Sequence, residues 1–218
     1  MTKIAALGIK TDFDLRTAAE REERPDEVPS GLANVWLNVL ADAKGNSAAE
    51  VQTLIAKLQE ANRVLGGGKA EALFVEAYKQ FVTLPSAKKS YHELFFALSD
   101  ANDGAALFHC TTEKDRTGWA AAALLTLLGV SEQQVYEDYL RSNEYIIPAY
   151  QKLIDRFVAA GGEASIPQDL LGVKAAYLKA SFDTMHAKYR TIEAYFADGL
   201  GLDKAGQPRL RDRFLTKE

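Results

Sequence analysis

The chain contains a single cysteine, Cys110, and this scarcity sets the first bounds on what the protein can be. One cysteine cannot form an internal disulfide, so the fold is not cross-linked by oxidation, and the sequence fits a reducing compartment. Long apolar runs are also lacking, since none approaches the roughly 20 residues that a membrane-spanning helix needs. The opening residues MTKIAALGIK lack the long apolar segment of a secretion signal. We therefore expect a cytoplasmic protein without an integral membrane segment, with secretion only if a further N-terminal segment exists.

A surplus of basic residues is absent as well. The 26 Lys and Arg residues are outnumbered by 30 Asp and Glu residues, which gives a formal net charge of -4. Proteins that bind nucleic acid usually carry a clear positive surplus, so we expect no nucleic-acid partner. Hydrophobic residues make up 47% of the chain and charged residues 26%, which is the composition of a globular protein with a sizeable core. The length suits one domain, which we assign to residues 1–218.

The pattern of apolar and turn-forming residues predicts strands alternating with helices. Short β-prone segments predict strands over about 9–15, 32–40 and 105–110, and the charged, proline-bearing stretch after the first strand predicts a surface loop with at most one helical turn. Helical spacing of apolar residues predicts that most of the remaining chain is helical. The expected fold is α/β, with a small, mostly parallel sheet surrounded by helices. We interpret residues 41–90 as a helical insertion and residues 131–172 as a helical lid.

The stretch FHCTTEKDRTGWAAAALLTLLG carries the strongest functional signal. Cys110 ends a predicted strand, and a helix is predicted from about Arg116 or Thr117. The first backbone N–H groups of a helix have no partner within it, so a tight loop that leads into a helix forms an anion site. Such a site favours the thiolate of Cys110, and the fork of the Arg116 guanidinium matches two phosphate oxygens. We predict that the anion is held by the loop residues Thr111, Thr112, Glu113, Lys114, Asp115 and Arg116.

This spacing predicts in-line attack of sulfur on a phosphate monoester, a phosphocysteine intermediate and its hydrolysis. With ordinary residue frequencies, His-Cys followed by five residues and Arg-Thr-Gly arises by chance in roughly one chain in tens of thousands. The alternative is an inert cysteine at the end of a strand. An inert cysteine does not account for the Arg-Thr-Gly that follows.

The leaving group of such a reaction needs a proton donor. No aspartate occurs from Lys44 through Ser99, and Asp100 and Asp103 lie too near the start of the strand that ends at the loop. Asp115, inside the loop, is therefore our candidate for general acid and then general base. Its alternative is a structural role, in which it pairs with a neighbouring cation or a helix N–H.

Three further side chains of the motif have two interpretations each. Lys114 adds a cation for a second phosphate, or is a solvated loop lysine. Thr117 donates its hydroxyl to the thiolate, or caps the helix. His109 points into the protein and holds the loop through hydrogen bonds, an interpretation that we favour over a direct role as acid or base. Near the first strand, Asp14 and Arg16 could reach the pocket, but we favour a role in fixing local loops.

The motif HCTTEKDRTG resembles the His-Cys-x-x-Gly-Lys-Asp-Arg-Thr-Gly signature of the bacterial atypical tyrosine and dual-specificity phosphatases of the mycobacterial PtpB type. The resemblance extends to the strand ending in Asp-Leu-Arg, to VYEDYLRSNEY and to the C-terminal helical segment. It implies a phosphatase-type fold, Cys110 as nucleophile, Arg116 as phosphate ligand and Asp115 as the acid of the loop. It implies Lys114 as the cation used for phosphoinositides. Substrates would be phosphotyrosine, phosphoserine/threonine and phosphoinositides, and no metal or other cofactor is implied.

The sequence departs from the family pattern at two places. Glu113 stands where the family has glycine, which puts a negative charge beside an anion site and a side chain where the loop prefers none. If this side chain points inward we expect low activity, and if it points outward we expect little cost. The family also begins with a segment that precedes the helix before Asp-Leu-Arg. We therefore expect a strand or two of the family to be absent from this sequence.

The leading hypothesis is a cysteine-dependent phosphatase that acts on a phosphorylated protein or a phosphoinositide. A sulfurtransferase or arsenate reductase also places a cysteine in an anion loop, but a single cysteine in mid-chain argues against both. The third hypothesis is a non-catalytic or weak phosphate- or phosphoinositide-binding module of the same fold, slowed by Glu113.

Overall fold

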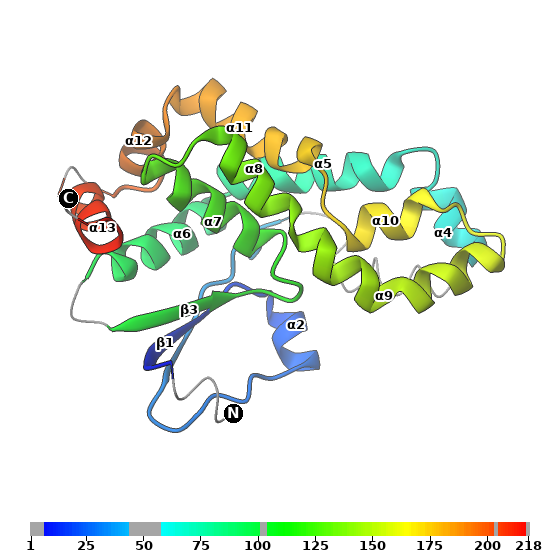
Figure 1. Ribbon diagram of the computed structural model, residues 1–218, viewed down its shortest axis with the longest axis horizontal. Coiled ribbons are helices and arrows are strands. Elements are labelled where there is room, and N and C mark those ends of the chain that lie inside the picture. Colours follow the sequence, from blue (N-terminus) through cyan, green and yellow to red (C-terminus); the bar gives the residue numbers. More distant parts are fainter. Residues whose placement is uncertain (1–6, 44–57, 101–103, 203–204, 217–218) are drawn as a thin grey trace.

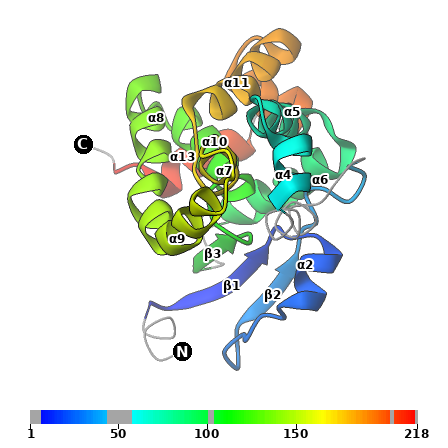
Figure 2. The ribbon, with the colours of Figure 1, turned by 90° about the vertical axis from the view of Figure 1, so that its right-hand side faces the viewer.

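A computed structural model describes residues 7–43, 58–100, 104–202 and 205–216 of the chain. Its sheet has three parallel strands, β1 (Ile9–Asp14), β2 (Ala33–Trp36) and β3 (Ala105–His109), in the order β2-β1-β3. Figures 1 and 2 show most of the helices gathered on one side of this sheet. The structure thus confirms the predicted α/β class and the small parallel sheet.

The helices account for most of the chain. A short helix, α2 (Ala18–Glu23), follows β1, and the segment between β2 and β3 contains α4 (Leu58–Leu65), α5 (Lys69–Thr83) and α6 (Pro85–Leu98). Helix α7 begins directly after the loop that follows β3. The helical elements from there to the C-terminal end are α7 (Arg116–Leu127), α8 (Glu132–Leu140), α9 (Ser142–Ala159), α10 (Ser165–Leu171), α11 (Ala175–Tyr189), α12 (Ile192–Ala194), the π-helical turn η2 (Tyr195–Gly199) and α13 (Gly206–Phe214).

The sheet separates an apolar face from a charged face. Successive side chains of a strand point to opposite faces. Phe13 and Leu15 are buried in the main core with the helices, while Asp12 and Asp14 project from the opposite face and are also buried. The strand β3 continues this division, because Phe108 packs against the main core. Because of this alternation, the side chains of Asp12 and Asp14 lie on the face of the sheet opposite the main core, next to His109 at the end of β3.

Two apolar clusters lie among the helices. The larger one contains residues from β1 through α13 and includes aromatic side chains of α5, α6, α7 and α11. The smaller one joins α4, α5, α9 and α10 through Ala61, Leu65, Ala70, Phe157, Ile166 and Leu170. Phe74 of α5 packs against both clusters. Helix α5 is therefore the element shared by the two.

Some boundaries differ from the sequence-based expectations. The stretch after β1, predicted to be a surface loop with at most one helical turn, forms the six-residue helix α2. Thr17 caps it, because its side chain accepts a hydrogen bond from the Glu20 amide while the Glu20 carboxylate accepts one from the Thr17 amide. The second strand is shorter than predicted and ends at Trp36. The N-terminal part of the helix predicted over 47–65 lies outside the described residues, as does most of the predicted turn at 102–104.

Within the described residues, no helix combines the length and the apolar character that crossing a membrane requires.

Candidate active site

The loop with the single cysteine connects β3 to α7, as the sequence predicted. Parallel pairing aligns Asp14 of β1 with His109, and the Leu15 amide donates to the His109 carbonyl oxygen at 2.8 Å. Helix α7 starts at Arg116, and its first helical hydrogen bond runs from the Trp119 amide to the Asp115 carbonyl oxygen at 2.8 Å. The amides of the first helical turn therefore precede that bond and are oriented toward the loop. The structure brings the cysteine and the helix N-terminus together.

Arg116 is buried and forms a bidentate ion pair with Glu20 of α2. Its two terminal nitrogens, Nη1 and Nη2, lie 2.7 Å from Oε2 and Oε1 of Glu20. Thr111 of the loop donates to the same carboxylate, with its Oγ1 2.5 Å from Oε1. The pair fixes the plane of the guanidinium, because both oxygens of the carboxylate match its fork. Helix α2 is thus part of the candidate site.

Burial and the contact between Glu20 and Arg116 shift the pKa of each group in opposite directions. Burial alone would raise the pKa of Glu20, but hydrogen bonds and charge from Arg116, with the Thr111 hydroxyl, lower it to about 2. Burial would likewise lower the pKa of Arg116, yet the bonds to Glu20, followed by the charges of Cys110 and Glu20, raise it overall. Arg116 is therefore a fixed positive charge near Cys110. Cys110 itself is only 4% exposed.

Glu113 adopts the left-handed conformation that glycine would adopt easily, with φ of 57°. Its side chain folds back along the loop. Oε2 accepts a hydrogen bond from the Cys110 amide at 2.9 Å and another from the Thr117 hydroxyl at 3.2 Å. In this conformation a carboxylate lies beside the cysteine backbone, and the Thr117 hydroxyl, predicted to serve the thiolate or to cap the helix, donates to Glu113. The residue as a whole is exposed, but its carboxylate turns back to the cysteine end of the loop.

Asp115 is held from the opposite side of the loop. Its Oδ1 lies 2.9 Å from Nζ of Lys114 and 3.0 Å from the hydroxyl of Tyr78, a residue of α5. Lys114 is 2% exposed, and its ammonium group lies over the ring of Phe74, 4.4 Å from the centroid. The interpretation of Lys114 as a solvated loop lysine is therefore wrong, because the side chain is buried between Asp115 and an aromatic ring. Its positive charge is paired with Asp115.

His109 points away from the loop toward the charged face of the sheet. Its Nδ1 donates to the Cys110 carbonyl oxygen at 3.1 Å, so its Nε2 faces two carboxylates, each 3.4 Å away, from Asp12 and Asp26. The hydrogen bond with Asp12 raises the pKa of His109 to about 9, although burial opposes the shift. The side chain is thus an imidazolium at neutral pH, and it holds the backbone of the cysteine as predicted.

The charged face forms one ionic cluster, defined by Asp12, Asp14, Arg16, Arg21, Asp26 and His109. Arg16 donates to Asp14 from its backbone N and from Nε, both at 2.9 Å from Oδ1, and reaches Asp26 at 2.6 Å. The ionic cluster supports the local role favoured for Asp14 and Arg16. Asp12, Asp26 and His109 are close enough to share a metal ion, yet three carboxylates, two guanidinium groups and one imidazolium already balance in charge.

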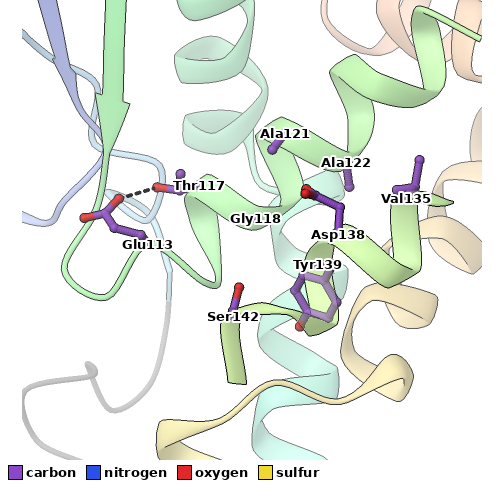
Figure 3. A pocket seen from close by; sticks show the side chains of 9 residues that line it. All are labelled: Glu113, Thr117, Gly118, Ala121, Ala122, Val135, Asp138, Tyr139 and Ser142. Atoms are coloured by element: carbon purple, nitrogen blue, oxygen red, sulfur yellow. Dashed lines mark hydrogen bonds between the residues drawn. The ribbon is translucent and has the colours of Figure 1, made fainter. Parts of the chain in front are cut away.

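A small pocket borders the loop on the side of Glu113. It has a volume of about 90 Å³ and lies between the start of α7, the end of α8 and the first residue of α9. Figure 3 shows Glu113 and Thr117 at one side of it and Asp138, Tyr139 and Ser142 at the other. Its remaining lining residues are Gly118, Ala121, Ala122 and Val135. The loop therefore borders a pocket on the Glu113 side and is packed against α5 on the Asp115 side.

Sequence reasoning missed Glu20, which pairs with Arg116, and Tyr78, whose hydroxyl contacts Asp115. A signal existed for Glu20, because Thr17 and Glu20 have the spacing of a capping box and so mark a helix start. That signal does not say that the carboxylate also binds an arginine 96 positions away. Tyr78 is one of nine tyrosines, and nothing in its local sequence distinguishes it from a core residue.

Taken together, a parallel strand, a cysteine, a five-residue loop and a helix that opens with arginine define the class of phosphatase-type α/β proteins. The comparison with known proteins agrees. Residues 1–216 match the family described as the tyrosine phosphatase family. The chain therefore belongs to the tyrosine phosphatase family, whose members are enzymes.

Individual relatives are distant in sequence but extensive in coverage. A putative tyrosine-protein phosphatase of Cupriavidus necator is 29% identical, with the match covering 99% of this chain and 73% of the relative. The triple specificity protein phosphatase PtpB of Mycobacterium tuberculosis is 28% identical, over 96% of this chain and 83% of the relative. A tyrosine-protein phosphatase of Nostoc commune is 30% identical, over 88% and 62%. The similarity thus includes the loop and the elements that surround it.

Proposed function

We propose that the protein hydrolyses phosphate monoesters through a phosphocysteine intermediate, with Cys110 as the nucleophile. The observation that carries the proposal is the position of Cys110 at the start of a loop that ends in a buried, charged Arg116 and a helix N-terminus. These groups supply what the reaction needs, namely a sulfur atom, a cation and backbone N–H groups for the equatorial oxygens of the phosphoryl group.

In the first step the sulfur of Cys110 forms a bond to phosphorus as the bond from phosphorus to the leaving oxygen breaks. The proton of Asp115 goes to that oxygen. Lys114 and Tyr78 then stabilise the carboxylate that remains, because both already contact Oδ1. In the second step Asp115 takes a proton from water, the water oxygen bonds to phosphorus, and the bond between sulfur and phosphorus breaks. The products are inorganic phosphate and the free thiolate.

The substrate that we propose first is phosphotyrosine in a protein. The family and the relatives described as tyrosine-protein phosphatases support it. The relative described as a triple specificity protein phosphatase supports substrates beyond phosphotyrosine. The candidates that we propose are phosphoserine/threonine and phosphoinositides, which the resemblance of the loop implies. For phosphoinositides the proposed cation was Lys114, whose charge is paired with Asp115 at 2.9 Å. A second phosphate would therefore have to compete with that ion pair.

The test is hydrolysis of p-nitrophenyl phosphate by the wild-type protein and by Cys110→Ser. We expect hydrolysis that orthovanadate inhibits, and a loss of at least about 1,000-fold in the variant, because a hydroxyl is a far weaker nucleophile than a thiolate. Calorimetric measurement of orthovanadate binding to Cys110→Ser checks that the loop is still formed. An unchanged rate in Cys110→Ser would exclude the mechanism.

A second candidate function is a weak or non-catalytic phosphate-binding module of the same fold. The observation that favours it is the carboxylate of Glu113, which accepts hydrogen bonds from the Cys110 amide and the Thr117 hydroxyl and so lies beside the candidate anion site. Saturable binding of phosphopeptide by a wild-type protein that shows no hydrolysis would favour this candidate over the first.

A further inference from the structure

Tyr78 of α5 contacts the loop at Asp115. The mechanism proposed above uses this contact only to stabilise the Asp115 carboxylate after the proton has left. The ring of Tyr78 is fully buried in α5, among the aromatic side chains of the main core. Its hydroxyl lies 3.0 Å from Oδ1 of Asp115 and 3.1 Å from the Lys114 carbonyl oxygen. The hydroxyl oxygen of Tyr78 also accepts a hydrogen bond of 2.7 Å from the hydroxyl of Tyr139. A single buried hydroxyl thus touches both the backbone and the side-chain carboxyl group of the loop.

The contact distinguishes the two oxygens of Asp115. Tyr78 reaches Oδ1 only, while the ammonium group of Lys114 lies 2.9 Å from each oxygen. A hydroxyl that donates to Oδ1 favours the carboxyl tautomer with its proton on Oδ2, because a protonated Oδ1 would lose acceptor capacity toward that donor. Burial, followed by the charge of Asp115, raises the pKa of Tyr78 well above its ordinary value, so the hydroxyl keeps its proton.

The anchor of this hydroxyl is rigid. The Tyr78 ring packs against Phe81 and Tyr177 at centroid distances of 4.9 Å and 5.7 Å, and its backbone carbonyl accepts the hydroxyl of Ser181 at 2.7 Å. A side chain held at both its ring and its backbone can fix the rotamer of the carboxyl group that it contacts. Asp115 itself is in the loop, where a free carboxyl group would sample several rotamers.

We propose that Tyr78 is the positioning residue for proton transfer by Asp115, holding Oδ1 so that the proton on Oδ2 is directed to the leaving oxygen. This inference rests on the proposed function, since it needs Asp115 as the general acid. It assigns a role in the reaction to α5, a helix of the segment between the second and third strands. Tyr78 acts through Asp115 and does not itself touch the substrate.

The chain provides a matched control in Tyr91 of α6. Its ring is also fully buried, and its hydroxyl donates to the carbonyl of Arg116, the first residue of α7, at 3.1 Å. Tyr78→Phe and Tyr91→Phe each remove one buried hydroxyl and one hydrogen bond to a backbone carbonyl, that of Lys114 in the loop and that of Arg116 at the start of α7.

Only Tyr78→Phe also removes a bond to the carboxyl group of Asp115. Tyr78→Phe also removes the acceptor of the Tyr139 hydroxyl. Of these losses, only that of the bond to Asp115 should depend on the leaving group, so the comparison is made across a series of leaving groups.

The experiment compares kcat/KM for a series of aryl and alkyl phosphates, from good to poor leaving groups, in the wild type and four variants. These are Asp115→Asn, Tyr78→Phe, Tyr91→Phe and the double variant of Asp115 and Tyr78. A poor leaving group needs the proton most. We expect Tyr78→Phe to cost about tenfold with the poorest leaving group and less than about twofold with the best. For Tyr91→Phe we expect the same loss with every leaving group.

The double variant distinguishes a positioning role from a structural one. If Tyr78 acts through Asp115, Tyr78→Phe causes no further loss in the Asp115→Asn background, whereas independent effects multiply. A loss in Tyr78→Phe that is uniform across leaving groups, or that multiplies with Asp115→Asn, overturns the inference and leaves the proposed function intact. A uniform loss in Asp115→Asn overturns Asp115 as the acid, and the inference with it. Thermal unfolding of each variant identifies losses that come from misfolding.

Discussion

At the scale of single residues, the ion pair between Glu20 and Arg116 connects the stability of the protein to acid. Glu20 is 6% exposed, and its pKa is lowered from 4.5 to about 2. A carboxyl group whose pKa is lower in the folded state stabilises the fold above its unfolded pKa. That stabilisation is lost as the pH falls through the folded value. Glu20 therefore stabilises fully above about pH 4.5, and this contribution declines between pH 4.5 and 2.

The lowered pKa of Glu20 predicts how urea unfolding depends on pH. We expect Glu20→Gln to lower the free energy of unfolding at pH 7 by about 3 kcal/mol, since the variant leaves Arg116 buried without its partner charge. Between pH 4.5 and 2 the gap between wild type and variant should narrow. Two curves that remain parallel over this range would show that the pair does not carry the acid dependence.

His109 gives the opposite pH dependence. Its pKa is raised from 6.5 to about 9, chiefly by the hydrogen bond with Asp12. A raised pKa contributes stability that is complete below pH 6.5 and is lost as the pH rises through 9. An NMR titration of the His109 ring should have its midpoint near pH 9, and Asp12→Asn should move this midpoint toward 6.5. Asp155→Asn, in α9, serves as the control. An unchanged midpoint in Asp12→Asn would contradict the assignment.

Substitution of Glu113 tests whether its carboxylate, which accepts a hydrogen bond from the Cys110 amide, opposes anion binding. We expect Glu113→Gly to bind orthovanadate about tenfold more tightly, because a like charge leaves the anion site and a glycine accepts φ of 57° without strain. Glu113→Gln keeps the backbone conformation and removes only the charge, so it separates the two causes. If neither variant binds orthovanadate more tightly than the wild type, the carboxylate does not compete with the anion.

The sequence indicated the residues of the loop but not the partners that hold them. Cys110 and Arg116 lie at the two ends of one five-residue stretch, so the sequence alone places them in the same short segment of chain. Glu20 and Tyr78 lie 96 and 37 positions from the loop residues that they contact. Such contacts depend on how the helices pack, and the spacing of residues along the chain does not report it.

At the scale of elements, the corner between α9 and α10 is closed by two adjacent glycines with different constraints. A Cβ at Gly162 would lie 2.2 Å from the ring of Phe157, a residue of the smaller apolar cluster. A Cβ at Gly161 would meet nothing within 4 Å, but the residue has φ of 93°. The first position is thus limited by space and the second by backbone conformation.

We expect Gly162→Ala to lower the free energy of unfolding by about 2–3 kcal/mol, because the ring of Phe157 must move out of its packed position. Gly161→Ala should cost only about 1 kcal/mol, the usual penalty of a left-handed conformation. Thermal and urea unfolding of both variants measure the difference. A larger loss in Gly161→Ala than in Gly162→Ala would contradict this account, and the rate of hydrolysis at 25 °C should be unchanged in both.

Elements were predicted best where a single signal dominated. The strands β1 and β3 and the helix α7 begin within two residues of their predicted positions, since alternation and an alanine-rich apolar run are strong local signals. The stretch that forms α2 is charged and followed by prolines, and it was predicted to be mainly loop. Its helix is stabilised by the cap at Thr17 and by the bond of Glu20 to Arg116, and the second of these is a tertiary contact.

At the scale of the whole molecule, we propose that residues 1–218 fold as one domain, in which 41–90 is an insertion and 131–172 a lid. The main core supports the first part, because it runs from Phe13 in β1 to Leu210 in α13. The pocket beside Glu113 supports the second, since α8 and the start of α9 form one of its walls (Figure 3). Helix α5 of the insertion also reaches the loop, through Tyr78.

The strand order β2-β1-β3 has a consequence for how the anion site comes into being. The central strand β1 is the first in the chain. It can pair with β3 only after α4, α5 and α6 have been synthesised, because they precede β3 in the sequence. Closing so long a stretch of chain is slow compared with forming local helices. Glu20 and Arg116 meet only when this closure is complete. During synthesis on the ribosome, Arg116 is therefore without the carboxylate that fixes its guanidinium until the first half of the protein has emerged and folded back on itself.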